Sequence, residues 1–101
     1  VTGRRVADFD PPIRGSVDPN ATVVDAVIGR GSTIASGAVV ERSVLFDDCI
    51  IEAGATVTDS ILSSGVRVGE RARLSGGSVI GRGEVIAAGS ELAGARRPPQ
   101  E

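Results

Sequence analysis

The sequence predicts an all-β chain wound as a triangular parallel β-solenoid, and three repeating features indicate this fold. An aliphatic residue recurs every five or six positions, a small residue stands two positions before it, and Gly, Asn or Asp often stands three positions after it. Residues two apart on a strand face the same side, so each short strand would turn one small and one large side chain inward. Gly, Asn and Asp tolerate the positive φ of a tight corner.

The aliphatic residues mark the strands in order along the chain. We expect these fourteen to be buried and the residue before each to point outward: Val17, Val23, Ile28, Ile34, Val40, Leu45, Ile51, Val57, Leu62, Val68, Leu74, Ile80, Ile86 and Leu92. "DAVI" at 25–28, "RSVL" at 42–45, "DSIL" at 59–62 and "GSVI" at 77–80 align at intervals of 17 or 18 residues. Three strands therefore make one coil, about 4.5 coils in all. A step of five or six residues does not match the helical period of 3.6.

Small side chains fill the slot two residues before most of these aliphatics. The slot holds Ala21, Ala26, Ser32, Ala38, Ser43, Cys49, Ala55, Ser60, Ala72, Ser78 and Ser90, and only Gly15, Val66 and Glu84 depart from Ala, Ser or Cys. Burying an unpaired carboxylate is costly, so we expect Glu84 near an open end of the coil. A shift of register would instead turn Glu91 inward. The expected corners are Asn20, Gly31, Gly37, Asp48, Gly54, Gly65, Gly83 and Gly89.

The flanks of the repeat differ from its body. Residues 1–15 contain no hexads, and Pro11 and Pro12 favour an extended segment, so we predict a linker from a preceding domain there. The solenoid is expected over residues 16–92 and a C-terminal tail over 93–101.

Composition excludes several classes of partner. All eleven basic residues are Arg, set against thirteen Asp and Glu, and they are dispersed along the chain. Neither a nucleic-acid footprint nor a membrane-binding segment is therefore predicted. The lone Cys49 occupies a small-residue slot, which indicates a buried thiol and fits a reducing compartment, so we expect a cytoplasmic protein.

The hexads resemble those of left-handed β-helix proteins. This family holds acyltransferases, γ-type carbonic anhydrases and the C-terminal domains of sugar-1-phosphate nucleotidyltransferases. The stretches "VVERSVLFDDCIIEAGATVTDSIL" and "VIGRGEVIAAGSELAGAR" are similar to the C-terminal domains of mannose-1-phosphate guanylyltransferases. The likeness covers roughly residues 16–97 and implies a left-handed coil, whose hand the spacing alone does not fix.

Catalytic groups of these relatives are missing from the sequence. The acyltransferases use a catalytic His and the carbonic anhydrases a three-His zinc site, and this sequence has no His. The nucleotidyltransferases bind magnesium in a separate N-terminal domain with a Gly-rich "GxGxR" loop, of which there is no trace here. We therefore expect no catalytic, cofactor-binding or metal-binding residue in this chain, and magnesium only in the inferred missing domain.

The resemblance implies a non-catalytic module of an enzyme that joins a nucleoside triphosphate to a sugar 1-phosphate and releases pyrophosphate. We expect the module to dock its own catalytic domain or a second β-helix and to support a homo-oligomer. Two alternatives stay open: a fragment of a hexapeptide-repeat acyltransferase and a free-standing structural solenoid.

Two columns of outward residues carry specific expectations. Interface candidates are Val27, Val44, Ile61 and Val79, because a solvated face has no need of a β-branched apolar residue in every coil. High β-propensity is the alternative explanation. Asp25, Arg42 and Asp59 recur at intervals of 17 residues, so Arg42 is expected between two carboxylates.

Overall fold

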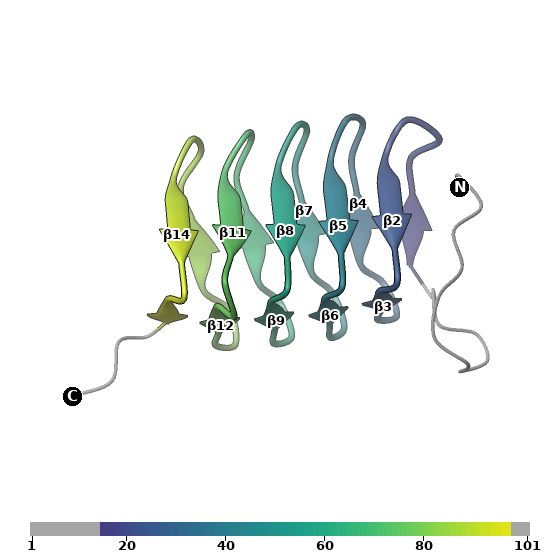
Figure 1. Ribbon diagram of the computed structural model, residues 1–101. Coiled ribbons are helices and arrows are strands. Elements are labelled where there is room, and N and C mark those ends of the chain that lie inside the picture. The colour runs from purple at the N-terminus through teal and green to yellow at the C-terminus, as the bar shows by residue number, and fades with distance from the viewer. Residues whose placement is uncertain (1–14, 98–101) are drawn as a thin grey trace.

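The computed structural model describes residues 15–97 as a coil of short parallel strands, with no helix among them (Figure 1). The strands are β1 (Ser16–Val17), β2 (Thr22–Val24), β3 (Val27–Ile28), β4 (Thr33–Ile34), β5 (Val39–Glu41), β6 (Val44–Leu45), β7 (Ile50–Ile51), β8 (Thr56–Thr58), β9 (Ile61–Leu62), β10 (Arg67–Val68), β11 (Arg73–Ser75), β12 (Val79–Ile80), β13 (Val85–Ile86), β14 (Glu91–Ala93) and β15 (Arg96–Arg97). Three consecutive strands form one coil, so these fifteen strands make five coils.

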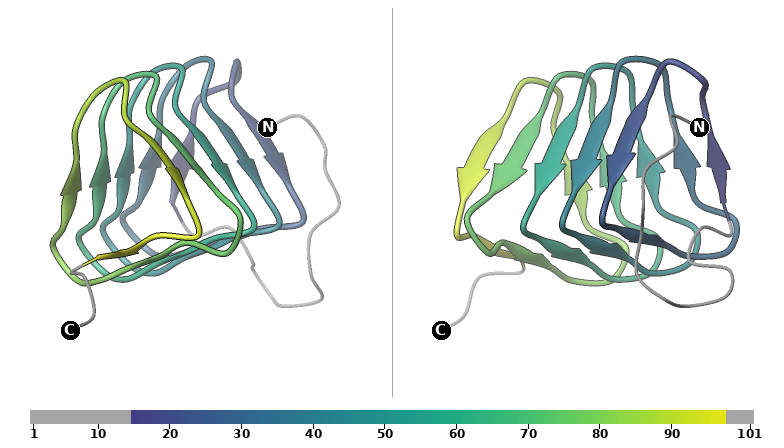
Figure 2. Two further views of the ribbon diagram at one scale, coloured as in Figure 1. Left: turned by 60° about the vertical axis from the view of Figure 1, so that its left-hand side comes forward. Right: turned by 45° about the vertical axis from the view of Figure 1, so that its right-hand side comes forward.

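Every third strand joins the same sheet, which gives the coil three flat faces. The sheets have the strand orders β1-β4-β7-β10-β13, β2-β5-β8-β11-β14 and β3-β6-β9-β12-β15. Seen from its C-terminal end, the chain runs clockwise as it approaches the viewer (Figure 2, left). The solenoid is therefore left-handed, as the family resemblance implied.

The core follows the predicted register. Twelve of the fourteen aliphatics are buried, and Val17 and Leu92, in the first and last coils, are partly buried and pack against the others. Ile51 is fully buried whereas Ile50, beside it on β7, is 38% exposed. Alternation along each strand thus separates a core of aliphatic and small side chains from the outer faces.

Serine side chains in the small slots connect successive coils. Ser32 Oγ donates to the Phe46 carbonyl at 2.9 Å and accepts the backbone N–H of Cys49 at 2.9 Å. Ser43 Oγ accepts the N–H of Ser60 at 3.1 Å in the same manner. These hydroxyls therefore satisfy buried backbone donors that an alanine in the slot would leave without a partner.

Glu84 is only half-buried and belongs to the last coil. The strand pairing runs unbroken into that coil, with Arg67 opposite Val85 and Arg73 opposite Glu91. Glu91 is exposed. The register shift is thereby excluded, and Glu84 lies near the open end, as expected.

Seven of the eight predicted corner residues have positive φ, and Asn20 does not. The Asn20 N–H donates to Asp18 Oδ1 at 2.8 Å, so a side chain closes this corner in place of a left-handed backbone. Sequence reasoning missed a further set of positive-φ corners: Asp25, Arg42, Asp59, Arg71, Gly76, Gly77 and Gly94.

At the C-terminal side, the coil continues past residue 92, where the hexad pattern ends. β15 pairs with β12, with Arg97 opposite Ile80. The expected linker, apart from Gly15, and residues 98–101 of the expected tail lie outside the described residues. Across residues 15–97 there is no helix long and apolar enough to cross a membrane.

Candidate functional site

The four interface candidates form a continuous column on the outer face of the β3-β6-β9-β12-β15 sheet. Val27 pairs with Val44, Val44 with Ile61, and Ile61 with Val79. Ile61 is 44% exposed, and the three valines are half-buried. We call these four residues the apolar strip. It ends at the last coil, where Arg96 pairs with Val79.

Phe46 extends the strip sideways and was missed by sequence reasoning. It is 51% exposed and lies two residues after Val44, so alternation places it on the same outer face. The equivalent positions in the other coils hold Gly29, Ser63 and Gly81, whose backbone N–H groups make the same inter-coil hydrogen bond. One side of the strip therefore carries a single projecting ring beside small residues. Its spacing of two residues from Val44 could have indicated from the sequence that Phe46 faces the same side as the strip.

The corners that precede β6 and β9 are charged, with Arg42 and Asp59 at positive-φ positions. Arg42 Nε donates to Asp59 Oδ1 at 2.8 Å, and a second guanidinium N–H donates to Asp59 Oδ2 at 3.1 Å. Glu41 lies 3.7 Å from Arg42, whereas no ion pair joins Arg42 to Asp25. The predicted column is therefore confirmed for Asp59 and wrong for Asp25, because the planar guanidinium makes a two-point contact with one carboxylate.

The contact between Arg42 and Asp59 shifts the pKa values of both side chains. The hydrogen bond from Arg42 lowers the pKa of Asp59, and the same contact raises the pKa of Arg42. Because the folded pKa of Asp59 is depressed, its contribution to stability is present above the pKa of the unfolded chain. That contribution is lost as the pH falls through the folded value.

We expect Arg42→Gln to raise the pKa of Asp59 toward its ordinary value, since the charged donor is removed. A carboxyl-detected NMR titration measures this shift. Arg67→Gln is the matched control, because it breaks a separate Arg–carboxylate pair, 2.6 Å from Arg67 Nε to Glu52 Oε2, and should leave Asp59 unchanged. An Asp59 titration that is identical in the wild type and Arg42→Gln would contradict the assignment.

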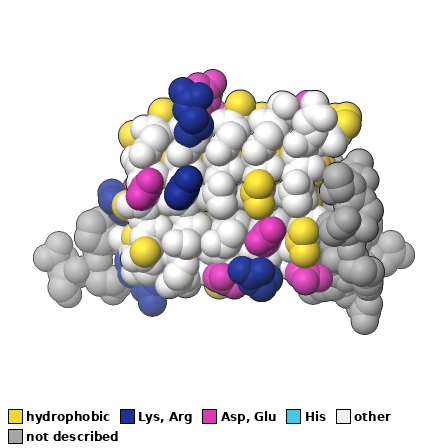
Figure 3. Space-filling view, turned by 45° about the horizontal axis from the view of Figure 1, so that its top comes forward, with side chains coloured by type: hydrophobic (Ala, Val, Ile, Leu, Met, Phe, Trp, Pro, Cys, Tyr) yellow, Lys and Arg dark blue, Asp and Glu magenta, His cyan; other side chains and the backbone are white. Residues whose placement is uncertain are grey.

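The other two outer faces are mixed in character. Their outward columns are Ser16, Thr33, Ile50, Arg67 and Val85 on one sheet, and Thr22, Val39, Thr56, Arg73 and Glu91 on the other. Figure 3 shows acidic, basic and apolar side chains scattered over a mostly uncharged surface. Neither face has the uninterrupted apolar column of the strip.

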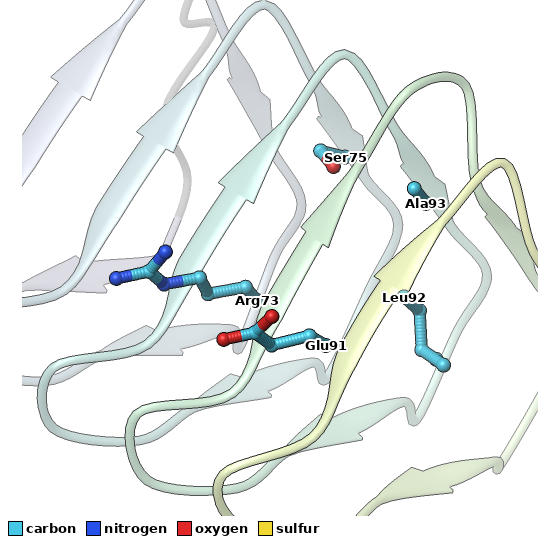
Figure 4. Close-up of a pocket in the computed structure, with 5 residues that line it drawn as sticks. All are labelled: Arg73, Ser75, Glu91, Leu92 and Ala93. Carbon is cyan, nitrogen blue, oxygen red and sulfur yellow. The ribbon is translucent and has the colours of Figure 1, made fainter.

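A shallow hollow lies at the C-terminal end of the coil and is lined by Arg73, Ser75, Glu91, Leu92 and Ala93. Figure 4 shows Leu92 turned to the inside of the coil and Arg73 and Glu91 on its outer side. The hollow lies beside β14, the last strand of its sheet, where no further coil within residues 15–97 covers the core. No group of three or more His, Cys, Asp or Glu within residues 15–97 is arranged to hold a metal ion.

Cys49 is buried, and burial raises the pKa of its thiol. Its Sγ contacts the Ser63 carbonyl oxygen at 3.1 Å. A protonated thiol in a closed slot is a packing element, since only an accessible thiolate is an effective nucleophile.

The chain matches the family described as "GMPPB C-terminal domain" over residues 14–96. Among solved structures, it is similar to the acetyltransferase domain of PglB from Neisseria gonorrhoeae FA1090, with 30% identity and a TM-score of 0.48. The similarity covers 84% of this chain and 49% of that one, so the chain spans about half of that structure's length. No curated protein matches the chain significantly. The family match takes in nearly the whole described coil, and the chain therefore belongs to the GMPPB C-terminal domain family.

Proposed function

We propose that this chain is the non-catalytic β-helix module of a sugar-1-phosphate nucleotidyltransferase of the mannose-1-phosphate guanylyltransferase type. The family match over residues 14–96 is the observation that carries this proposal. The parent enzyme would form a nucleotide sugar and pyrophosphate in a magnesium-dependent catalytic domain that is separate from this chain. A cytoplasmic location fits such an enzyme, whose substrates are soluble phosphates.

The module's own work is to provide a rigid docking surface. Its core is built of aliphatic and small side chains, and its one thiol is buried. We therefore assign the module a role in binding another protein. The apolar strip is the part of that surface best suited to contact, because four neighbouring coils repeat an apolar residue there. Burial of such a strip against another protein surface removes apolar area from water and favours association.

We expect Val44→Asp combined with Ile61→Asp to impair assembly of the full-length parent and to lower its pyrophosphorylase turnover. Two carboxylates placed side by side in a covered face would be desolvated without partners. Sedimentation velocity and a coupled pyrophosphate assay measure the two effects.

The matched control is Thr33→Asp combined with Ile50→Asp. These residues pair on neighbouring coils of another sheet and also point outward. The control should leave assembly and turnover near the wild-type values. Wild-type behaviour of the Val44 and Ile61 double variant would reject the docking role.

A further inference from the structure

We propose that the free edge of β14, at the C-terminal end of the coil, binds an extended segment of a partner protein as a further parallel strand, and that this segment places a basic residue outward and an aliphatic residue inward. The inference is independent of the apolar strip, because β14 belongs to a different sheet. It follows from a backbone donor, a core residue and a carboxylate that all lack a partner within residues 15–97 and lie on this one short strand.

The backbone of β14 has a neighbouring strand on one side only. Each earlier strand of this sheet donates a hydrogen bond to the next coil, as in Thr56 N–H to the Ala72 carbonyl at 2.8 Å and Arg73 N–H to the Ser90 carbonyl at 2.7 Å. The Glu91 N–H is the equivalent donor of the last coil, and it has no acceptor among residues 15–97. An added strand would supply that acceptor from its main chain, which is how a sheet edge captures an extended peptide.

The core is incomplete at the same place. Leu92 points to the inside of the coil but is only partly buried, whereas Leu74, one coil earlier, is completely buried (Figure 4). Leu92 also lines the hollow beside β14. Ile86, the inward residue of β13, is already buried. An aliphatic side chain opposite Leu92 would therefore fill the hollow and remove apolar surface from water.

The outward residue of β14 sets the charge of the partner. Glu91 is exposed and forms no ion pair within residues 15–97. Side chains opposite each other on neighbouring strands interact, and opposite charges there are favourable, so a basic residue is favoured opposite Glu91. β11, on the inner side of β14, already has this pattern, with Arg73 opposite Glu91 and Leu74 opposite Leu92.

Stacking of two coils end to end does not meet these requirements. Two C-terminal ends would present N–H donors to N–H donors and Glu91 to Glu91. The first strand of the same sheet, β2, has the uncharged Thr22 at the outward position, and its Val23 is already completely buried. The strand that fits β14 is therefore an extended segment of a partner rather than the end of a second coil.

A peptide that copies β11 tests the inference in the 101-residue chain. The probe is the acetylated and amidated tetrapeptide Ala-Arg-Leu-Ser, and heteronuclear NMR follows the backbone amides at millimolar peptide. We expect the amide protons of Glu91 and Ala93 to move downfield and to exchange more slowly with solvent, since carbonyl groups of the bound peptide would accept from them. Two matched peptides should bind more weakly, by roughly threefold or more. They are Ala-Glu-Leu-Ser, which reverses the charge, and Ala-Arg-Ser-Ser, which removes the aliphatic side chain.

Exchange of the charges gives a second readout that does not depend on the absolute affinity. Glu91→Arg should bind Ala-Glu-Leu-Ser more tightly than Ala-Arg-Leu-Ser, which reverses the order expected for the wild-type chain. Glu70→Arg is the matched control, because Glu70 is also exposed but lies on a corner away from β14, and this variant should keep the wild-type order. Circular dichroism checks that both variants are folded.

The remaining outcomes each reject a part of the inference. Equal binding of the two charged peptides by the wild-type chain would overturn the charge assigned to the partner. Peptide-induced shifts that leave Glu91 unaffected would reject β14 as the docking edge. If the Glu91 amide instead shifts with protein concentration alone, a second copy supplies the strand, and a partner protein is rejected as its source.

Discussion

Replacing Ile51 with alanine should lower the free energy of unfolding by about 2–5 kcal/mol. Ile51 is completely buried in the middle coil, between Ile34 and Val68 in the stacked strands. Its neighbours are held by hydrogen bonds to the coils on both sides, so they cannot collapse freely into the space left behind. Since small domains are stable by only about 5–15 kcal/mol, this one change would remove a large part of the total.

Ile50→Ala is the matched control, because it deletes the same atoms from the neighbouring residue of β7. Ile50 points outward and is 38% exposed, so the expected loss is below about 1 kcal/mol. Urea unfolding followed by circular dichroism measures both variants. A larger loss for Ile50→Ala than for Ile51→Ala would show that the register of the coil is wrong.

The fold was predictable because its core has a period that the sequence repeats. The interval of 17 or 18 residues between "RSVL", "DSIL" and "GSVI" sets the pairing of Val44, Ile61 and Val79 that the structure shows. A wrong register by one residue would bury Arg67 and Arg73 in place of Val68 and Leu74. The sequence excludes that alternative on the free energy of burying charge.

Corners and ends were less predictable because the chain can turn either with a positive-φ residue or with a side-chain hydrogen bond. Asp25, Arg42 and Asp59 have positive φ two residues after an inward aliphatic, whereas the predicted corners stand three residues after one, so the spacing rule did not find them. At Asn20 the side chain of Asp18 closes the turn instead. Arg97 pairs with the buried Ile80 but is itself exposed, and an Arg at this register position lacks the aliphatic signal by which β15 would have been recognised.

The candidate site was predicted in part for similar reasons. Strand pairing places Val27, Val44, Ile61 and Val79 side by side, and that pairing follows from the repeat. On the sheet of the strip, the position after the inward aliphatic holds a large apolar residue only at Phe46, and Gly or Ser in the neighbouring coils, so it forms no repeating apolar column. The choice of Asp59 over Asp25 as the partner of Arg42 depends on side-chain rotamers, which a column of residues does not specify.

Gly69→Ala tests a close approach between coils that the repeat alone does not foretell. The same column holds Ala35 and Glu52, each making the same inter-coil hydrogen bond, so the pattern predicts that alanine is tolerated or gains about 0.4–1 kcal/mol. The geometry predicts the opposite sign. A Cβ at the buried Gly69 would lie 2.6 Å from Ala88 N and 2.9 Å from the Ile86 carbonyl oxygen, which are backbone atoms of the last coil.

Those backbone atoms cannot retreat cheaply, because the Gly69 N–H donates to the Ile86 carbonyl at 2.8 Å. We therefore expect Gly69→Ala to cost about 1–3 kcal/mol in urea unfolding, the range for overpacking a closed site. Gly69 lacks the positive φ of the corner glycines, so steric overlap is the cause under test. Glu52→Ala, in the equivalent position one coil earlier, should cost about 1 kcal/mol at most, through its exposed pair with Arg67. If Gly69→Ala is instead stabilised, the last two coils are no closer at this position than the other coils are. The presence of Ala35 and Glu52 in the same column would then be the better guide to which side chains the position tolerates.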